Sequence, residues 1–470
     1  MKKYISITLF VIFLVPVINV FSQGYKIEVT INDLKNEELY LAYHYASKVY
    51  VLDTVRTDEN SYALFTGEEK LEGGMYLVYL PNKDFFDFLI SDDQEIKFQT
   101  GIENLVENMK VTGSKENDEF FKFQKYLKTS RQKQAALRND RNKPNISQSE
   151  KDKINLELNK LNDAVNFFWD NIIETNRGSF VATFLSALKE IKVPPAPVDA
   201  NGQAIDQYFR YNYFVNHFFD NVDLSDPKLI RTSILNDKLE RYFTKILVQS
   251  ADSILPAALT IIEKAKKGNF EVFKFIVQNI INRYSSPKIM GTDAIYVAVA
   301  ELYYLSGIAD WISDSDLNII KERVKMIKPN LIGRTAPNLI MESPEGETIS
   351  LHDFKSKYTI LLFWDHECGH CKKTIERLKE IYPKYSDKEV RIFAVYTMEN
   401  IDSWKEYIKE QNLNWTHVSD NLNKTHFRDI YDAWANPTIY ILDANKTIIA
   451  KKFDIEQLEG LLNHFMENAI

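Results

Sequence analysis

The sequence predicts a multidomain chain with an all-β, sandwich-like N-terminal domain, an all-α middle domain and a C-terminal α/β domain. Short runs rich in Val, Ile, Tyr and Phe, separated by turn residues, recur over the first hundred residues. Apolar residues then repeat at helical spacing, and strand-like and helix-like segments finally alternate. The predicted domain boundaries are 24–112, 113–330 and 331–470.

Residues 1–23 are predicted to be a secretory signal peptide. Lys2 and Lys3 precede an uncharged apolar run, residues 5–20, and a short polar stretch offers a cleavage site after Gln23. The alternative is a retained membrane anchor, because the run is nearly long enough to span a bilayer. We therefore expect an exported protein that is membrane-associated only if this segment is not cleaved, and no later stretch predicts a membrane span.

The charge of the chain argues against a nucleic-acid partner. The net charge is −8 at pH 7, and the predicted mature chain, which loses two lysines, keeps 56 basic against 66 acidic residues. Such a mildly acidic chain without a concentrated basic patch is a poor nucleic-acid binder.

Seven short strands at a spacing of about ten residues predict the β-domain. They are expected at 25–31, 39–43, 50–55, 62–65, 75–80, 85–90 and 95–99. Residues 82–84 and 91–94 are predicted to be tight hairpin turns.

The middle domain is predicted to contain about eight helices. Helices are expected at 119–127, 156–173, 204–220, 228–250, 254–265, 269–283, 292–306 and 314–327, with a polar stretch of exposed helix and loop at 128–153. Its histidines are single and unclustered, so no metal site is predicted there.

The C-terminal segments follow the order of the thioredoxin fold. A βαβ unit is predicted to precede a β-hairpin and a closing helix. The strands are expected at 359–364, 390–396, 415–418, 438–442 and 447–453, and the helices at 368–384, 402–411 and 455–466.

The only two cysteines of the chain, Cys368 and Cys371, stand where the apolar strand 359–364 gives way to a helix. Backbone N–H groups and the macrodipole at a helix N-terminus favour an anion, so a thiol there ionises at a lower pH than a free thiol. A second cysteine three residues on can attack the mixed disulfide made by the first and release the partner. A disulfide between them closes too small a loop to stabilise this chain much, so the spacing favours redox chemistry over a structural role.

Four segments resemble the TlpA/ResA-like branch of thioredoxin-fold, AhpC/TSA-related proteins: Gly333–Pro337, Leu361–Trp364, Cys368–Cys371 and Asn436–Thr438. Residues 24–330 resemble, by pattern, uncharacterised domains that precede such a module in many exported proteins of Gram-negative bacteria. The resemblance implies a periplasmic thiol–disulfide oxidoreductase that needs no cofactor. It also implies a protein disulfide or dithiol substrate and an upstream redox partner in the cell envelope.

The resemblance further implies a role for single residues. Cys368 matches the exposed nucleophile, and Cys371 matches the buried resolving cysteine. Pro437 matches a proline whose preceding peptide bond is cis, and the backbone of Asn436 would pair with an extended segment of the partner. Trp364 matches the aromatic residue near the active-site turn.

Two positions depart from the family pattern. Leu362 stands where thioredoxins carry a buried acid, and Thr374 stands where ResA-like proteins carry a glutamate. Asp365, Glu367, the flanking lysines and water remain as candidates for moving the proton of the resolving thiol.

The dipeptide Gly369-His370 bears on the direction of electron flow, because it is the pair found in protein disulfide isomerases. A protonated histidine near the nucleophile stabilises the thiolate and makes the disulfide more oxidising. The rest of the domain resembles reductants, so we predict a reductant, with an isomerase or oxidant as one alternative. The other alternative is an envelope protein that binds a partner and whose thioredoxin module only docks.

Three other chemistries do not fit the sequence. A zinc site lacks a second cysteine pair, and His366 and His370 lie in the same tight turn. Covalent haem attachment requires a histidine directly after the second cysteine, where Lys372 stands. The stretch 365–367 lacks the Thr or Ser and the Pro that a related peroxidase would need.

Overall fold

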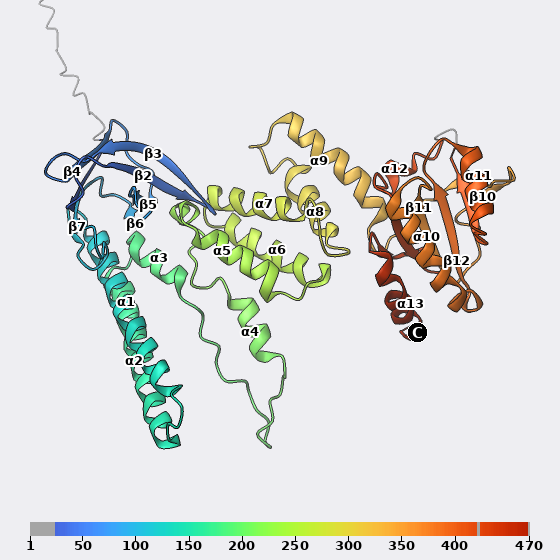
Figure 1. The fold of residues 1–470 in the computed structure, drawn as a ribbon. Coiled ribbons are helices and arrows are strands. Elements are labelled where there is room, and N and C mark those ends of the chain that lie inside the picture. The colour runs from blue at the N-terminus through green and yellow to red at the C-terminus, as the bar shows by residue number, and fades with distance from the viewer. Residues whose placement is uncertain (1–23, 421–423, 469–470) are drawn as a thin grey trace, which may run out of the picture. The chain divides into compact units, whose positions relative to one another are not determined.

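The computed structural model describes residues 24–420 and 424–468 (Figure 1). The predicted signal peptide, residues 1–23, lies outside the described residues. The chain forms two compact units. The first runs to Asp223 and includes Pro227–Lys238, and the second consists of Leu224–Asp226 and the chain from Leu239 onward. The domain boundaries given above stay a prediction.

The first unit begins with two four-stranded sheets, in the orders β4-β1-β7-β8 and β3-β2-β5-β6. The strands are β1 (Tyr25–Asn32), β2 (Glu38–Tyr45), β3 (Lys48–Arg56), β4 (Tyr62–Gly67), β5 (Gly74–Tyr79), β6 (Phe85–Ile90), β7 (Glu95–Gly101) and β8 (Lys110–Thr112). Alternate residues of β1, namely Ile27, Val29 and Ile31, are fully buried, as expected for strands with one face on a core. The strand-rich N-terminal domain is thus confirmed.

Two details differ from the prediction. Strand β8 was not predicted, because its three residues give too short a pattern to detect. The turn at 91–94 does not close a hairpin, because β6 and β7 belong to different sheets. The turn at 82–84 does close one, between β5 and β6, with Lys83 at a φ of 72°.

Four α-helices complete the first unit up to Asp223. They are α1 (Lys115–Arg141), α2 (Gln148–Thr175), α3 (Phe180–Leu188) and α4 (Phe209–His217). Helices α1 and α2 pack against each other as a long pair (Figure 1). Helix α3 was not predicted, because it is only nine residues long and its less buried side carries just two polar residues, Thr183 and Ser186.

Helices also begin the second unit. After α5 (Ile234–Arg241), which lies where the units meet in sequence, come α6 (Ala251–Lys266), α7 (Phe270–Tyr284), α8 (Asp293–Val299) and α9 (Asp314–Ile327). A 3₁₀ turn, Lys328–Asn330, extends α9. These helices confirm the helical middle region. No helix among the described residues has the length and apolar character needed to cross a membrane.

The C-terminal part of the second unit is a seven-stranded sheet in the order β10-β9-β13-β12-β11-β14-β15. The strands are β9 (Ile340–Glu342), β10 (Thr348–Ser350), β11 (Tyr358–Trp364), β12 (Val390–Tyr396), β13 (Thr416–Ser419), β14 (Thr438–Leu442) and β15 (Ile448–Lys451). The helices are α10 (Gly369–Ile381), α11 (Ile401–Glu410), α12 (Phe427–Ile430) and α13 (Leu458–Glu467).

Strand β11 lies inside this sheet, between β12 and β14, and is buried along its whole length. It runs parallel to β12 and antiparallel to β14. Its even-numbered residues, such as Leu362, join a core cluster that includes α10 and α13, and its odd-numbered residues, such as Phe363, join a separate cluster on the opposite face. Because both faces are covered, β11 reads as a continuous apolar run. The thioredoxin fold is confirmed.

A buried ion pair joins the helices of the second unit to this sheet. The ammonium group of Lys451, at the end of β15, pairs with Asp293 at the start of α8. The same nitrogen donates to the carbonyl oxygen of Asn330 at 2.8 Å and to its Oδ1 at 3.1 Å. Burial lowers the pKa of Lys451, and the charge of Asp293 opposes that shift.

We expect Asp293→Ala to destabilise the second unit by about 3–5 kcal/mol, because it leaves the Lys451 charge buried without its partner. The double variant Asp293→Leu/Lys451→Met should recover most of this loss, since an apolar pair of similar volume replaces the ions. Urea unfolding followed by tryptophan fluorescence measures this, because five of the six tryptophans lie in this unit.

The matched control is Glu301→Ala, which breaks the exposed ion pair with Lys328 in the same unit. That pair should contribute at most about 1 kcal/mol. If Asp293→Ala and Glu301→Ala lowered the free energy of unfolding equally, the larger contribution assigned to the buried pair would be contradicted.

Candidate active site

The two cysteines lie at the junction of β11 and α10. Strand β11 ends at Trp364, three residues of turn follow, and Cys368 is the N-cap residue of α10, with φ −76° and ψ 123°. Cys368 is partly buried, Cys371 is fully buried, and both are free thiols. The helix N-terminus therefore lies at the more accessible thiol, as the sequence pattern predicts.

The surroundings of Cys371 keep its thiol neutral. Burial raises its pKa to about 12, and a hydrogen bond and the charges of Cys368 and Asp365 act in the same direction. The backbone N–H of Asp365 opposes the shift by donating to the Cys371 Sγ at 3.5 Å. Cys371 is consequently protonated at neutral pH and must lose a proton before it can act as a nucleophile.

Cys368 faces the loop that carries Pro437. Its Sγ donates to the carbonyl oxygen of Asn436 at 3.6 Å, and the Asn436–Pro437 peptide bond is cis. The side-chain amide of Asn436 donates to the Thr397 Oγ1 at 2.7 Å, and that hydroxyl donates to the carbonyl oxygen of Trp364 at 3.1 Å. The structure thus brings together Cys368, Asn436 and Pro437 as the resemblance implies.

Thr397 is a residue of this site that the sequence analysis missed. It is buried and comes directly after β12, which is parallel to β11 and adjacent to it. Parallel neighbours end at the same edge of a sheet, so the residue after β12 necessarily lies near the end of β11. The position of Thr397 near the cysteines could thus have been predicted from the order of the strands. Its hydrogen bonds to Asn436 and Trp364 could not.

Trp364 lies in the core beneath the turn. It is fully buried, and its ring lies 5.9 Å from that of Tyr407, 6.3 Å from that of Tyr396 and 5.9 Å from that of His417 between centroids. Burial lowers the pKa of His417 to about 4, so this histidine is neutral at physiological pH. The Trp364 side chain therefore packs in the same core cluster as Cys371, and its carbonyl group is bonded to Thr397.

Gly369 and His370 occupy the first turn of α10, where both are exposed. A Cβ atom added at Gly369 would meet nothing within 4 Å, so sterics do not require a glycine at this position. His370 contributes to the wall of a cavity of about 620 Å³ that Pro437 also lines. Polar side chains from α10 and from the end of β15 line the same cavity.

The two positions that depart from the family pattern are both inside the domain. Leu362 is fully buried, and Thr374 is nearly so. Of the acidic candidates, the side chain of Asp365 is only 13 % exposed, whereas that of Glu367 is 73 % exposed. Asp365 is thus the acid shielded from solvent next to Cys371.

The histidines near the cysteines differ in their surroundings. His366 is buried, with its Nε2 3.1 Å from the Ser403 Oγ, whereas His370 is exposed. Across the described ranges, 24–420 and 424–468, no group of three or more His, Cys, Asp or Glu side chains is placed to hold a metal ion.

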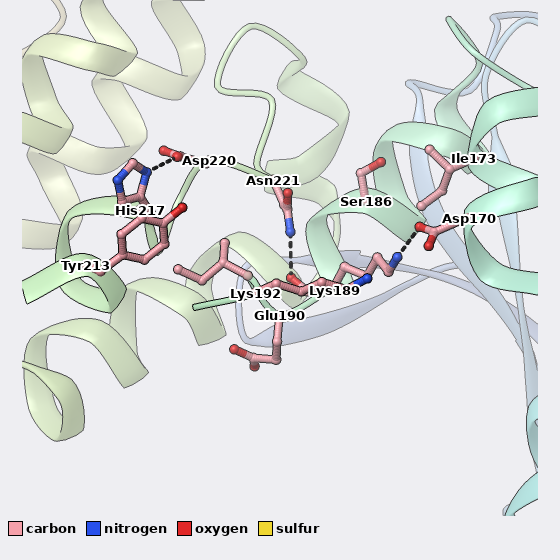
Figure 2. A pocket seen from close by; sticks show the side chains of 11 residues that line it. Asp170, Ile173, Ser186, Lys189, Glu190, Lys192, Tyr213, His217, Asp220 and Asn221 are labelled. Carbon is pink, nitrogen blue, oxygen red and sulfur yellow. Dashed lines mark hydrogen bonds and ion pairs between the residues drawn. The ribbon is translucent and has the colours of Figure 1, made fainter. Parts of the chain in front are cut away.

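Another cavity, of about 440 Å³, lies in the first unit among residues of α2, α3, α4 and the segments that follow α3 and α4 (Figure 2). Figure 2 shows Nδ1 of His217 paired with Asp220 at 2.5 Å, and Lys189 paired with Asp170 across the pocket. Tyr213 stacks on the His217 ring, with 4.1 Å between centroids. The residues lining this cavity include none of the site residues predicted from the sequence.

Comparison with known proteins assigns the chain to families along most of its length. Residues 332–451 match the AhpC/TSA family, residues 147–330 match a domain of unknown function, DUF5106, and residues 25–120 match another, DUF4369.

Two similar relatives are thiol-disulfide oxidoreductases. The chain is 33 % identical over 134 residues to the thiol-disulfide oxidoreductase ResA of Bacillus cereus, covering 28 % of this chain and 76 % of that protein. It is 28 % identical over 134 residues to ResA of Bacillus subtilis, covering 28 % of this chain and 73 % of that protein.

Two solved structures are also similar. One is a domain of a possible thiol-disulfide isomerase from Cytophaga hutchinsonii, at 36 % identity, 30 % of this chain, 95 % of that chain and a TM-score of 0.28. The other is a thioredoxin-like protein from Bacteroides caccae, at 23 % identity, 59 % of this chain, 99 % of that chain and a TM-score of 0.45. From the match to ResA and to the AhpC/TSA family, the chain belongs to the thioredoxin-fold thiol-disulfide oxidoreductases of the AhpC/TSA family.

Proposed function

We propose that this protein is exported to the periplasm by residues 1–23 and reduces disulfides of partner proteins there through Cys368 and Cys371. The observation that carries the proposal is the placement of the two thiols. Cys368 stands at the N-terminus of α10 beside Asn436, and Cys371 is buried behind it with a raised pKa. The Cys368 thiol is thus accessible to a partner, and the Cys371 thiol stays protonated until it attacks the mixed disulfide.

The reaction takes place in two exchanges. The Cys368 thiolate attacks one sulfur of the partner disulfide, forms a mixed disulfide and releases the other partner sulfur as a thiolate, which takes up a proton. Cys371 then loses its proton, attacks the Cys368 Sγ and releases the second partner thiol. The partner gains two electrons and two protons, and Cys368 and Cys371 become a disulfide. An upstream dithiol in the cell envelope must reduce that disulfide again.

We assign the proton transfer from Cys371 to Asp365. The position of the thioredoxin acid is occupied by Leu362, which cannot ionise. Asp365 is shielded from solvent, and its charge is one of the causes that raise the pKa of the Cys371 thiol. A carboxylate in that position can accept the proton when Cys371 attacks.

The docking of the partner is assigned to the loop before β14. The backbone of Asn436 would pair with an extended segment of the partner, next to Pro437 and the Cys368 Sγ. His370 lines the adjoining cavity and, when protonated, stabilises the Cys368 thiolate. Gly369 leaves the first turn of α10 open, and the buried Trp364 supports the turn from below. The assignment as a reductant rests on the resemblance of the domain to reductants.

We predict that Cys368→Ala abolishes reduction of insulin, a protein with accessible disulfides, when dithiothreitol supplies the electrons. Pre-reduced Cys371→Ala, freed of dithiothreitol, should instead accumulate a mixed disulfide with insulin, because no second thiol is present to resolve it. Turbidity of the reduced insulin chains measures the activity, and non-reducing electrophoresis detects the adduct. Full activity of Cys368→Ala would support the alternative in which the thioredoxin domain only docks a partner.

We further predict that the two thiols alkylate at very different rates. At pH 8, a thiol with a pKa of about 12 has roughly a thousandfold less thiolate than a free cysteine with a pKa of about 8.5. Reduced Cys368→Ala, which keeps Cys371, should therefore react with iodoacetamide at least about 100-fold more slowly than reduced Cys371→Ala.

Mass spectrometry of timed samples measures these alkylation rates. The same two variants in urea are the control, and there the rates should become equal. Comparable rates in the folded variants would contradict the raised pKa and the reserve role of Cys371.

A further inference from the structure

The loop that carries Pro437 is tied to helix α9 by an ion pair. Asp432 lies between α12 and β14, and its side chain is 8 % exposed. Its Oδ1 accepts a hydrogen bond of 2.6 Å from the Arg323 Nη1 on α9. Its other oxygen pairs with Lys452, directly after β15. A single carboxylate thus joins three segments that are distant in sequence.

Asp432 belongs to the wall of the cavity of about 620 Å³ described above. It lines that cavity together with His370 and Pro437, and it precedes Pro437 by five residues. Its backbone has a φ of 48°, in the left-handed region that favours glycine, asparagine and aspartate. The backbone conformation at this position suits an aspartate, and the two ion pairs fix where its side chain lies.

A second contact is made with the end of α12, directly before this loop. The side-chain amide of Asn330, in the 3₁₀ turn that extends α9, donates to the carbonyl oxygen of Ile430 at 3.2 Å and to that of Met326 at 2.6 Å. Arg323 and Asn330 are seven residues apart, which is about two helical turns. Helix α9 thus contacts the loop at Asp432, and its extension contacts the end of α12, directly before the loop.

The carboxyl group of Asp432 is stabilised in its charged form. Burial would raise the pKa of Asp432, but the hydrogen bonds and charges of Arg323 and Lys452 outweigh it, and the pKa is lowered. Asp432 is therefore ionised at neutral pH, and the contact is a charge-assisted one.

We propose that α9 is part of the redox site: Arg323, acting through Asp432, positions the loop from Asp432 to Pro437 for the docking of a protein disulfide. The inference rests on the proposed function, because it deepens the role of the docking loop. It gives the helical middle region a role in recognising the partner. Asp432 and Arg323 are positioning residues, since neither contacts the sulfur atoms.

The test compares a large and a small disulfide. A protein disulfide needs the docking loop, whereas the small aromatic disulfide 5,5′-dithiobis(2-nitrobenzoate) needs only an accessible Cys368 thiolate. Pre-reduced full-length protein is mixed with each substrate, and the second-order rate is measured by stopped flow. We expect Arg323→Gln and Asp432→Asn each to lower the rate with insulin at least about fivefold and to leave the rate with the small disulfide within about twofold. Arg323→Lys, which keeps the charge, should recover most of the loss.

The matched control is Lys325→Gln. Lys325 lies on the same helix, is 76 % exposed and pairs with Glu322 within α9. This variant should behave as the wild type with both substrates. Urea unfolding of each variant separates a docking defect from a loss of fold.

Two results would overturn the inference. One is an unchanged insulin rate in both Arg323→Gln and Asp432→Asn. The other is an equal loss with both substrates, which would mean that the variants act on the thiol itself or on the fold. Failure of the proposed function would look different, because wild type would then reduce neither substrate faster than Cys368→Ala.

Discussion

The geometry of the active site depends on the hydrogen bonds of one buried hydroxyl group. Thr397 donates to the carbonyl of Trp364 and accepts from the side chain of Asn436, so it uses both capacities of a hydroxyl. The first bond lies at the start of the turn that leads to Cys368, and the second lies in the loop that ends at Pro437. Because an unpaired buried polar group costs about 1–3 kcal/mol, the hydroxyl of Thr397 and the amide nitrogen of Asn436 favour the arrangement in which they are paired. The cysteine turn and the docking loop are thereby held in one arrangement.

The same arrangement separates the chemical roles of two identical side chains. Cys368 stands at a helix N-terminus with access to solvent, while Cys371, one turn later, is fully buried among core side chains. Spacing alone makes the cysteines neighbours, but burial decides which thiol stays protonated. The departures at Leu362 and Thr374 leave this division intact, because it rests on the position of α10 relative to β11 and not on an internal acid. In the proposed reaction, the proton acceptor is therefore Asp365 in the turn.

The ion pairs around Asp432 and Lys451 extend this account to the helices of the second unit. Lys451 and Lys452 are adjacent in sequence, yet one pairs with Asp293 of α8 and the other with Asp432 of the docking loop. Asp293, Lys451 and Asp432 are shielded from solvent, whereas the Lys452 side chain is 36 % exposed, and a buried charge that loses its partner is costly. Arg323 and Asn330 contact the loop from the same helix. The helical region thus contributes directly to the surroundings of the docking loop.

The sequence predicted the features that depend on neighbouring residues. It did not predict those that depend on residues far apart in the chain. Strands β1 to β7, the junction at Cys368 and the proline at 437 follow from short patterns and were found, whereas the three-residue strand β8 was not. Helix α3 was missed because nine mostly apolar residues give only a weak helical pattern, and the turn at 91–94 was misread because the partner of β6 is set by sheet assembly. Thr397 pairs with Asn436 across 39 residues, and Arg323 pairs with Asp432 across 109. Such contacts leave no trace in a single sequence, since each residue alone is an ordinary threonine or arginine.

The reduction potential of the Cys368–Cys371 pair tests the central claim most directly. Purified protein is equilibrated against thiol buffers of graded potential, and the free thiols are trapped and counted. The account predicts a single reversible two-electron transition at about −270 mV or lower, the range of thioredoxin. A transition at about −180 mV or higher would contradict the assignment as a reductant and make the protein an oxidant or isomerase. A pair that does not titrate reversibly would contradict thiol–disulfide exchange altogether.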